Sequence, residues 1–348
     1  MARSLDDTAK YLIKILRRGG QAANEVEKLI KAGRDDVIKK AVSMMSSGAT
    51  SNQVALMIHG EIAKLQGKTT KSLVTAATDA AVIEAGSTAA YLGALGVGSP
   101  KQVKVTKAFI RQTFDLPFPH QLISVNNLLT GTFAGMDVAL VNVVRDAIAR
   151  GDTIRSTSDY IRRSTGKLED PTVRRNSNAL ARTAVIQVSN QVRAKAFEEE
   201  DEVAGVLYVS TLDHRTSDIC MSLDGQYWAD KSQARVPPLH VSCRSSLAPV
   251  LKGENIDDVK DQLTRPAVEV KSVGQLEEQG LRTSGGRIRK PSKTGRSPLK
   301  GVVKNQYVTY EQWIKTQPVA YQQSILGRKA YSVLRETGSL SKALGFAD

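Results

Sequence analysis

The spacing of the apolar residues changes at one point in this 348-residue chain, and that change limits the fold more than any other feature. Before residue 200, apolar residues recur three or four positions apart, as on one face of an α-helix. From Val203 to Thr211, β-branched and aromatic residues alternate, which is typical of a strand. Asp224-Gly225 then favours a hairpin-type turn. We therefore expect an α+β fold with a mainly helical N-terminal half, a small α+β module in the middle and a short helical C-terminal tail.

The helices of the N-terminal half are predicted to be interrupted at several points. Gly19-Gly20 is expected to end a first helix, and a second is expected over 22–45. Ser51 is a candidate N-cap for a third helix, and a Thr/Ala-rich helix over 69–95 follows it. Further helices are predicted over 103–113, 122–150, 153–165 and 173–200, the last with the clearest periodicity.

Composition divides the chain into four parts. We expect a helical region over 1–170, the α+β module over 171–252, a linker over 253–308 and a helical tail over 309–348. The tail is predicted to hold two helices separated by glycines. Trp313 is expected to anchor the core of this tail or to form a hot spot against a partner, and not to stack on bases.

The charge balance and the cysteine content restrict the class of protein. Lys and Arg number 49 and Asp and Glu 35, which gives a net charge of +14 and favours a polyanionic partner such as nucleic acid. Two cysteines exclude a disulfide-dense secreted scaffold. Asp6 and Asp7 interrupt what would be the apolar core of a signal peptide, and no run of about 20 apolar residues predicts a membrane span.

A basic stretch lies inside the predicted linker. Such an arm can neutralise phosphates of double-stranded DNA without reading sequence, since it carries no aromatic residues to stack on bases. It can equally serve to keep two domains apart and soluble. Its candidate DNA-binding residues are Arg287, Arg289, Lys290, Lys293, Arg296 and Lys300.

Four of the six Cys and His residues of the chain fall between positions 213 and 244. One interpretation is a zinc site made by Cys220, His240 and Cys243, with Asp213 or His214 as a fourth ligand. Others are that the cysteines are small buried hydrophobes, or that they form a disulfide. A thiol triad of Cys220, His240 and Asp213 is also available, whereas no nucleotide-hydrolysis motif is present.

The same region carries a familiar order of residues. Arg182-Thr183 on the long helix precedes Asp213-x-Arg215-Thr216, Cys220 and Asp224-Gly225, and the motif closes with Pro237-Pro238-x-His240-x-x-Cys243-Arg244. This order, over about 173–250, resembles the phage Mu protein F-like minor head protein family. The tail around Trp313 resembles the C-terminal end of such proteins. Where the family typically ends the motif in Cys-Arg-Cys, this chain has Ser245, so one possible thiol ligand is missing.

The resemblance implies a minor head (capsid) protein of a tailed phage, active in head morphogenesis and in DNA packaging or ejection, and not an enzyme. It implies the portal protein, the major capsid or scaffold protein and double-stranded DNA as partners. The expected location is the virion, after synthesis in the host cytoplasm. For Arg182, Arg215 and Arg244 we expect buried pairing with carboxylates such as Asp213 or Asp218. A metal- or thiol-dependent hydrolase built on the Cys/His cluster is the alternative, and no cofactor other than zinc is expected.

Overall fold

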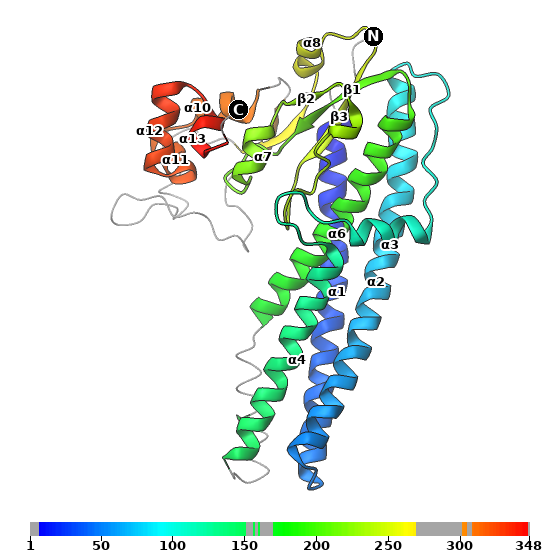
Figure 1. The fold of residues 1–348 in the computed structure, drawn as a ribbon, viewed down its shortest axis with the longest axis vertical. Coiled ribbons are helices and arrows are strands. Elements are labelled where there is room, and N and C mark those ends of the chain that lie inside the picture. The colour runs from blue at the N-terminus through cyan, green and yellow to red at the C-terminus, as the bar shows by residue number, and fades with distance from the viewer. Residues whose placement is uncertain are drawn as a thin grey trace.

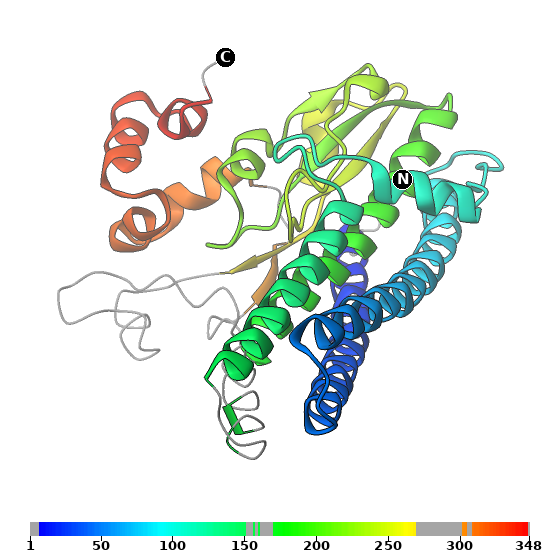
Figure 2. The same ribbon diagram turned by 60° about the horizontal axis from the view of Figure 1, so that its bottom comes forward.

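Helices form an elongated bundle that supports a small sheet at one end (Figure 1). The computed structural model describes residues 7–150, 156, 159–160, 170–268, 301–304 and 308–346. Four long helices run side by side in both ribbon views (Figures 1 and 2): α1 (Asp7–Ser46), α2 (Ser51–Ala94), α4 (Val125–Ala149) and α6 (Asp170–Glu199). A shorter helix, α3 (Lys107–Asp115), joins the second and third of these.

Helix α1 continues through Gly19-Gly20, so the prediction of two short helices is wrong. The reason is tertiary packing. A Cβ atom built on Gly19 would lie 3.2 Å from the Cα of Arg182, so α1 and α6 approach each other closely at this glycine. The two glycines let α1 and α6 cross at short distance. Burial of the apolar face of α1 offsets the low helix propensity of glycine.

Helix α2 is also one continuous element where two were predicted. Its N-cap is Thr50 and not Ser51, because Thr50 and Gln53 form a reciprocal capping box. Helices α3 and α4 begin later than predicted, at the caps Thr106 and Ser124. The long helix expected over 173–200 is confirmed by α6, whereas most of the helix expected over 153–165 lies outside the described residues.

Helix α4 is, in the described part of the chain, the one helix long and apolar enough to cross a membrane. This was not expected from the sequence, because polar residues such as Asn142 and Asp146 interrupt its apolar runs. Core helices of water-soluble bundles can be equally long and apolar. Leu129, Phe133 and Leu140 of α4 are buried in the bundle core.

A three-stranded antiparallel sheet follows α6, in the order β2-β1-β3. The strands are β1 (Val203–Val209), β2 (Tyr227–Trp228) and β3 (Ser246–Leu251), which confirms the α+β class. Short helices α7 (Asp218–Leu223) and η1 (Lys231–Gln233) lie between the strands in sequence. The Asp224-Gly225 turn therefore joins α7 to β2 and not two strands, and Gly225 adopts φ of +83° there.

The region predicted as a linker contains regular structure where it is described. Helix α8 (Ile256–Asp261) precedes β4 (Arg265–Val268), which pairs antiparallel with β5 (Gly301–Lys304). The backbone of Leu212 bridges to Ala267. This brings the start of β4 against the loop that follows β1.

The tail holds four short helices and not the two predicted: α10 (Tyr310–Thr316), α11 (Val319–Leu326), α12 (Arg328–Thr337) and α13 (Leu340–Leu344). Pro318 separates the first two, and Gly327 and Gly338 break the chain with φ of +80° and +68°. Trp313 is buried between Tyr310 and Tyr321, in a core that includes Leu212 and Met221 of the module. The tail therefore packs on the module beside α7 (Figure 1).

Candidate functional site

Asp213 organises the loop that follows β1. Its buried carboxylate accepts a bidentate pair of hydrogen bonds from Arg244, with Nη2 2.5 Å from Oδ1. The backbone N–H of Arg215 donates to Oδ1 at 2.8 Å, and Nη2 of Arg215 lies 3.5 Å from Oδ2. Burial alone would raise the pKa of Asp213, but Arg244 and Arg215 hold it well below its usual value. Asp213 is thus a charged structural anchor.

The predicted buried pairing with Asp213 is confirmed for Arg244, whose side chain is 15% exposed. Arg215 also pairs with Asp213, but its side chain is exposed, so the prediction of burial is wrong there. Arg182 does not pair with Asp213. Arg182 projects from α6 and donates from Nε to the amide oxygen of Asn178 at 3.3 Å. Burial and the nearby charges of Arg215 and Arg244 lower the pKa of Arg182. Positive charge therefore exceeds negative charge around Asp213.

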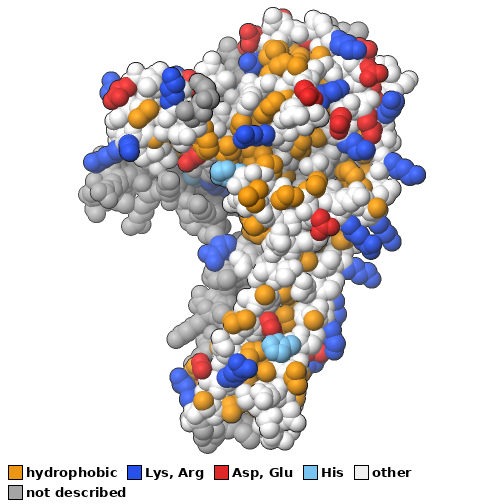
Figure 3. Space-filling view, viewed as in Figure 1, with side chains coloured by type: hydrophobic (Ala, Val, Ile, Leu, Met, Phe, Trp, Pro, Cys, Tyr) orange, Lys and Arg blue, Asp and Glu red, His pale blue; other side chains and the backbone are white. Residues whose placement is uncertain are grey.

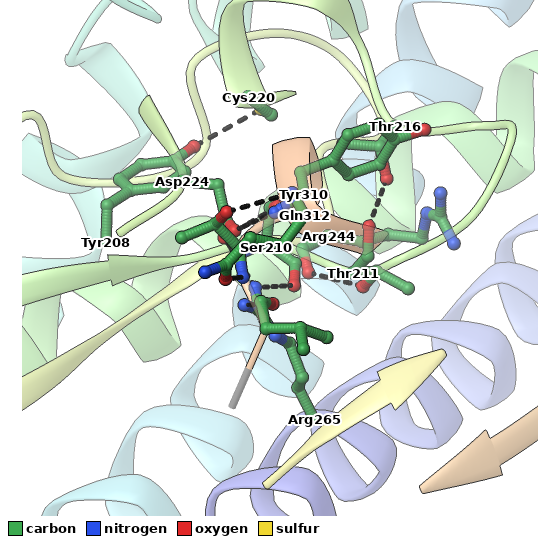
Figure 4. A network of polar contacts seen from close by, with 12 residues as sticks. Tyr208, Ser210, Thr211, Thr216, Cys220, Asp224, Arg244, Arg265, Tyr310 and Gln312 are labelled. Atoms are coloured by element: carbon green, nitrogen blue, oxygen red, sulfur yellow. Dashed lines mark hydrogen bonds and ion pairs between the residues drawn. The ribbon is translucent and has the colours of Figure 1, made fainter. Parts of the chain in front are cut away.

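A second buried ion pair joins the module to β4, and it was not predicted from the sequence. The side chains of Asp224 and Arg265 are fully buried, with Nη1 2.6 Å from Oδ1. The same Oδ1 accepts the N–H of Ser210 at 2.8 Å, and Oδ2 accepts the N–H of Tyr310 at 2.7 Å. Figure 4 shows these groups meeting from the residue after β1, from β4 and from the start of α10. Asp224 was assigned to a turn because it precedes glycine, and Arg265 fell in the predicted linker.

Three threonines of the motif hold the loops in place. Thr216 donates to the carbonyl of Thr211 at 2.5 Å, and Thr211 donates to the carbonyl of Arg244 at 3.1 Å (Figure 4). Thr183, buried in α6, accepts the N–H of Ser242 at 2.9 Å. The loop over 237–245, which begins with a cis peptide bond between Pro237 and Pro238, is thereby fixed against α6.

This loop brings His240 and Cys243 together with Cys220 of α7. Their ligand atoms all lie within 4.8 Å of one another. Cys220 Sγ is 3.7 Å from Cys243 Sγ and 3.3 Å from His240 Nε2. Both cysteines are free, so no disulfide is formed. Neither expected fourth ligand joins the group: Asp213 binds the arginines, and His214 faces the Tyr321 hydroxyl at 3.3 Å.

The two sulfur atoms differ in their electrostatic environment. Burial opposes a thiolate at Cys243, but hydrogen bonds from Cys220 and His240 hold its pKa well below the usual thiol value. A hydrogen bond to Cys243 and burial raise the pKa of Cys220, whose sulfur also contacts the Tyr208 hydroxyl at 3.2 Å. Burial disfavours the charged ring of His240, yet Cys243 raises its pKa overall. The group can provide one thiolate for nucleophilic chemistry or for a metal.

Access to this group is limited. Cys220 and Cys243 are 1% and 0% exposed, and only His240 is partly accessible. A substrate cannot reach either sulfur atom in this structure, which disfavours a thiol nucleophile.

The candidate DNA-binding residues cannot be placed, because Arg287, Arg289, Lys290, Lys293, Arg296 and Lys300 lie outside the described residues.

Comparison with protein families gives a match over residues 139–248, to the family described as Phage Mu protein F like protein. The chain carries a phage Mu protein F-like domain. This domain extends from α4 to β3 and so contains Asp213, Asp224, Arg244 and the Cys/His group. It begins earlier than the resemblance over 173–250 indicated, whereas the tail around Trp313 lies beyond it. Neither the curated proteins nor the solved structures contain a match to this chain.

The family is one of structural phage head proteins, which makes a bacteriophage structural protein the coarse assignment for this chain. Within the Mu F-like domain, the motif residues bind one another and the loop backbone. Asp213 with Arg244, and Thr183 with Ser242, are such contacts. These contacts hold the loops of the domain against one another and against α6.

Proposed function

We propose that this protein is a minor head protein of a tailed phage, made in the host cytoplasm and built into the virion at the portal. The observation that carries the proposal is the domain match, because it spans the whole motif region. The buried contacts of that motif support a structural role and not an enzymatic one. Asp224, for example, joins β1, β4 and α10 into one body.

The helical bundle is the proposed portal-binding part. Its α1, α2 and α3 precede the Mu F-like domain, and its surface carries exposed apolar side chains, which are scattered over the lower part of the bundle in Figure 3. Leu56 of α2 is 70% exposed and Val138 of α4 is 59% exposed. His59 Nδ1 of α2 lies 2.7 Å from Asp137 Oδ2 of α4. This contact brings the helix turns that carry Leu56 and Val138 next to each other. A contiguous exposed apolar patch is typical of a binding surface, and the proposal takes Leu56 and Val138 as parts of one.

Co-expression with the portal protein of the same phage tests this assignment. A stable complex on size exclusion is expected for the wild-type chain, and Leu56→Asp with Val138→Asp is expected to weaken it. Val319→Asp is a matched control, since Val319 is 53% exposed on the tail. If both variants bind portal as well as the wild type, the bundle face is not the contact. If the wild type forms no complex, portal association is excluded.

We further propose that the basic arm binds packaged double-stranded DNA without sequence specificity. The arm and the net charge of +14 support this step. Changing Arg287, Arg289, Lys290 and Lys293 to Glu is expected to weaken binding and to flatten its dependence on salt. The control changes four exposed lysines elsewhere by the same total charge: Lys39, Lys68, Lys71 and Lys104. Equal losses in a filter-binding assay would show that net charge matters and the arm does not.

A further inference from the structure

The proposed head function does not use the group formed by Cys220, His240 and Cys243. Around a tetrahedral zinc ion with Zn–S near 2.3 Å and Zn–N near 2.0–2.1 Å, two sulfur ligands lie about 3.8 Å apart and a sulfur and a nitrogen about 3.6 Å apart. Here the two sulfur atoms are 3.7 Å apart, and Cys220 Sγ is 3.3 Å from His240 Nε2. Both separations are therefore close to those between the ligands of a zinc ion.

The histidine is oriented as metal-binding histidines are. Its Nδ1 lies 2.9 Å from the carbonyl oxygen of Val241 and donates its proton there. That hydrogen bond leaves Nε2 with a free lone pair, as an outer partner does in many zinc sites. Ser217 Oγ, 2.7 Å from Nε2, donates to that lone pair, which points toward the cysteines. A metal ion would take the place of this proton.

A fourth position is available next to the sulfur atoms. Ser245 is 2% exposed, lies two positions after Cys243 and is near Cys220 and Tyr208. Its hydroxyl, or a water in contact with it, would complete a tetrahedral set around one ion. Two sulfurs and one imidazole favour zinc over magnesium or calcium, which take oxygen ligands.

We propose that Cys220, His240 and Cys243 bind one structural Zn²⁺ ion that fastens α7 to the loop over 237–245. Cys220 lies on α7, whereas His240 and Cys243 lie on the loop, so an ion between them cross-links two segments about 20 positions apart. The burial of both sulfur atoms assigns the ion a structural and not a catalytic role. The loop connects directly to β3, and the ion therefore stabilises the edge of the sheet.

The experiment uses the full chain, purified with a reductant and analysed for metal by mass spectrometry. One zinc per chain is expected. After the zinc is removed with a chelator, titration with Co²⁺ is expected to produce thiolate-to-metal charge-transfer bands and the intense visible bands of tetrahedral Co²⁺. Absence of both zinc and a Co²⁺ spectrum from the folded, reduced protein would overturn the proposal, as would isolation of the zinc-free chain with Cys220 and Cys243 joined in a disulfide.

Variants then assign the ligands. Cys243→Ser and His240→Gln are expected to weaken Zn²⁺ binding by more than about 100-fold, since loss of an outer partner alone costs about 10- to 100-fold. His120→Gln is the matched control, because His120 is exposed on a segment beside the loop but lies outside the cluster. Zinc retained by His240→Gln would contradict the assignment.

Ser245→Cys gives a test that does not depend on loss of folding. A third thiolate at this position is expected to lower the Kd for Zn²⁺, measured by competition with a chelator, and to add a thiolate charge-transfer band to the Co²⁺ spectrum. An unchanged Kd and spectrum would place Ser245 outside the coordination sphere and overturn the proposed fourth position.

Discussion

At the scale of single residues, Asp213 is the clearest case of a charge that the fold requires. It is buried, and Arg244 binds it through two hydrogen bonds. Asp213→Asn leaves Arg244 buried without a counter-charge, and loss of one partner of a buried pair costs about 3–5 kcal/mol. We expect the free energy of unfolding at pH 7 to fall by about that amount in urea denaturation. Asp257→Asn, at an exposed site, is expected to change it by less than about 0.5 kcal/mol.

The same residue makes stability depend on acid. The pKa of Asp213 is lowered in the folded chain, so its contribution is complete above the unfolded value of about 3.9 and is lost as the pH falls through the folded value. The difference in unfolding free energy between the wild type and Asp213→Asn is therefore expected to shrink below pH 4. A difference that stays constant from pH 7 to pH 3 would contradict a charged, paired Asp213.

At the scale of elements, the Asp224 carboxylate fastens the tail to the module. It binds Arg265 of β4 and the N–H of Tyr310 at the start of α10. Asp224→Asn is expected to speed hydrogen exchange of the backbone amides in α10 to α13 by at least about tenfold, because Arg265 is left with an unbalanced charge. Asp230→Asn is the control, since Asp230 is exposed and caps only η1. Equal amide exchange rates of α10 to α13 in the two variants would show that this ion pair does not hold the tail on the module.

Two glycines inside long helices are expected to respond in opposite directions to replacement by alanine. A Cβ on Gly33 of α1 would lie 2.3 Å from Leu65 Cδ1, whereas a Cβ on Gly60 of α2 would meet nothing within 4 Å. We expect Gly33→Ala to lower the unfolding free energy by about 1–3 kcal/mol through overpacking. Gly60→Ala is expected to raise it by up to about 1 kcal/mol through helix propensity. Stabilisation by Gly33→Ala would show that α1 and α2 are not packed as described.

At the scale of the whole molecule, local periodicity predicted most helices and the strand β1, because each is built from its own residues. It failed where a distant segment decides the outcome. Gly19-Gly20 remains helical because α6 packs against it, and Asp224 pairs with Arg265, which is 41 positions away. Spacing did identify the Cys220, His240 and Cys243 group, since unusual residue types close in sequence often meet in space. Spacing alone left Asp213 both as a possible metal ligand and as a partner of Arg244, and the fold selects the pairing with Arg244.

The head-protein assignment rests on the Mu F-like domain, which includes α6 and the end of α4 and on which the tail packs (Figure 1). Quantitative mass spectrometry of purified phage particles tests it most directly, by counting this chain against the portal protein before and after DNA release. The account predicts a few to about a dozen copies of this chain in every particle that contains portal. Its absence from such particles would contradict the account.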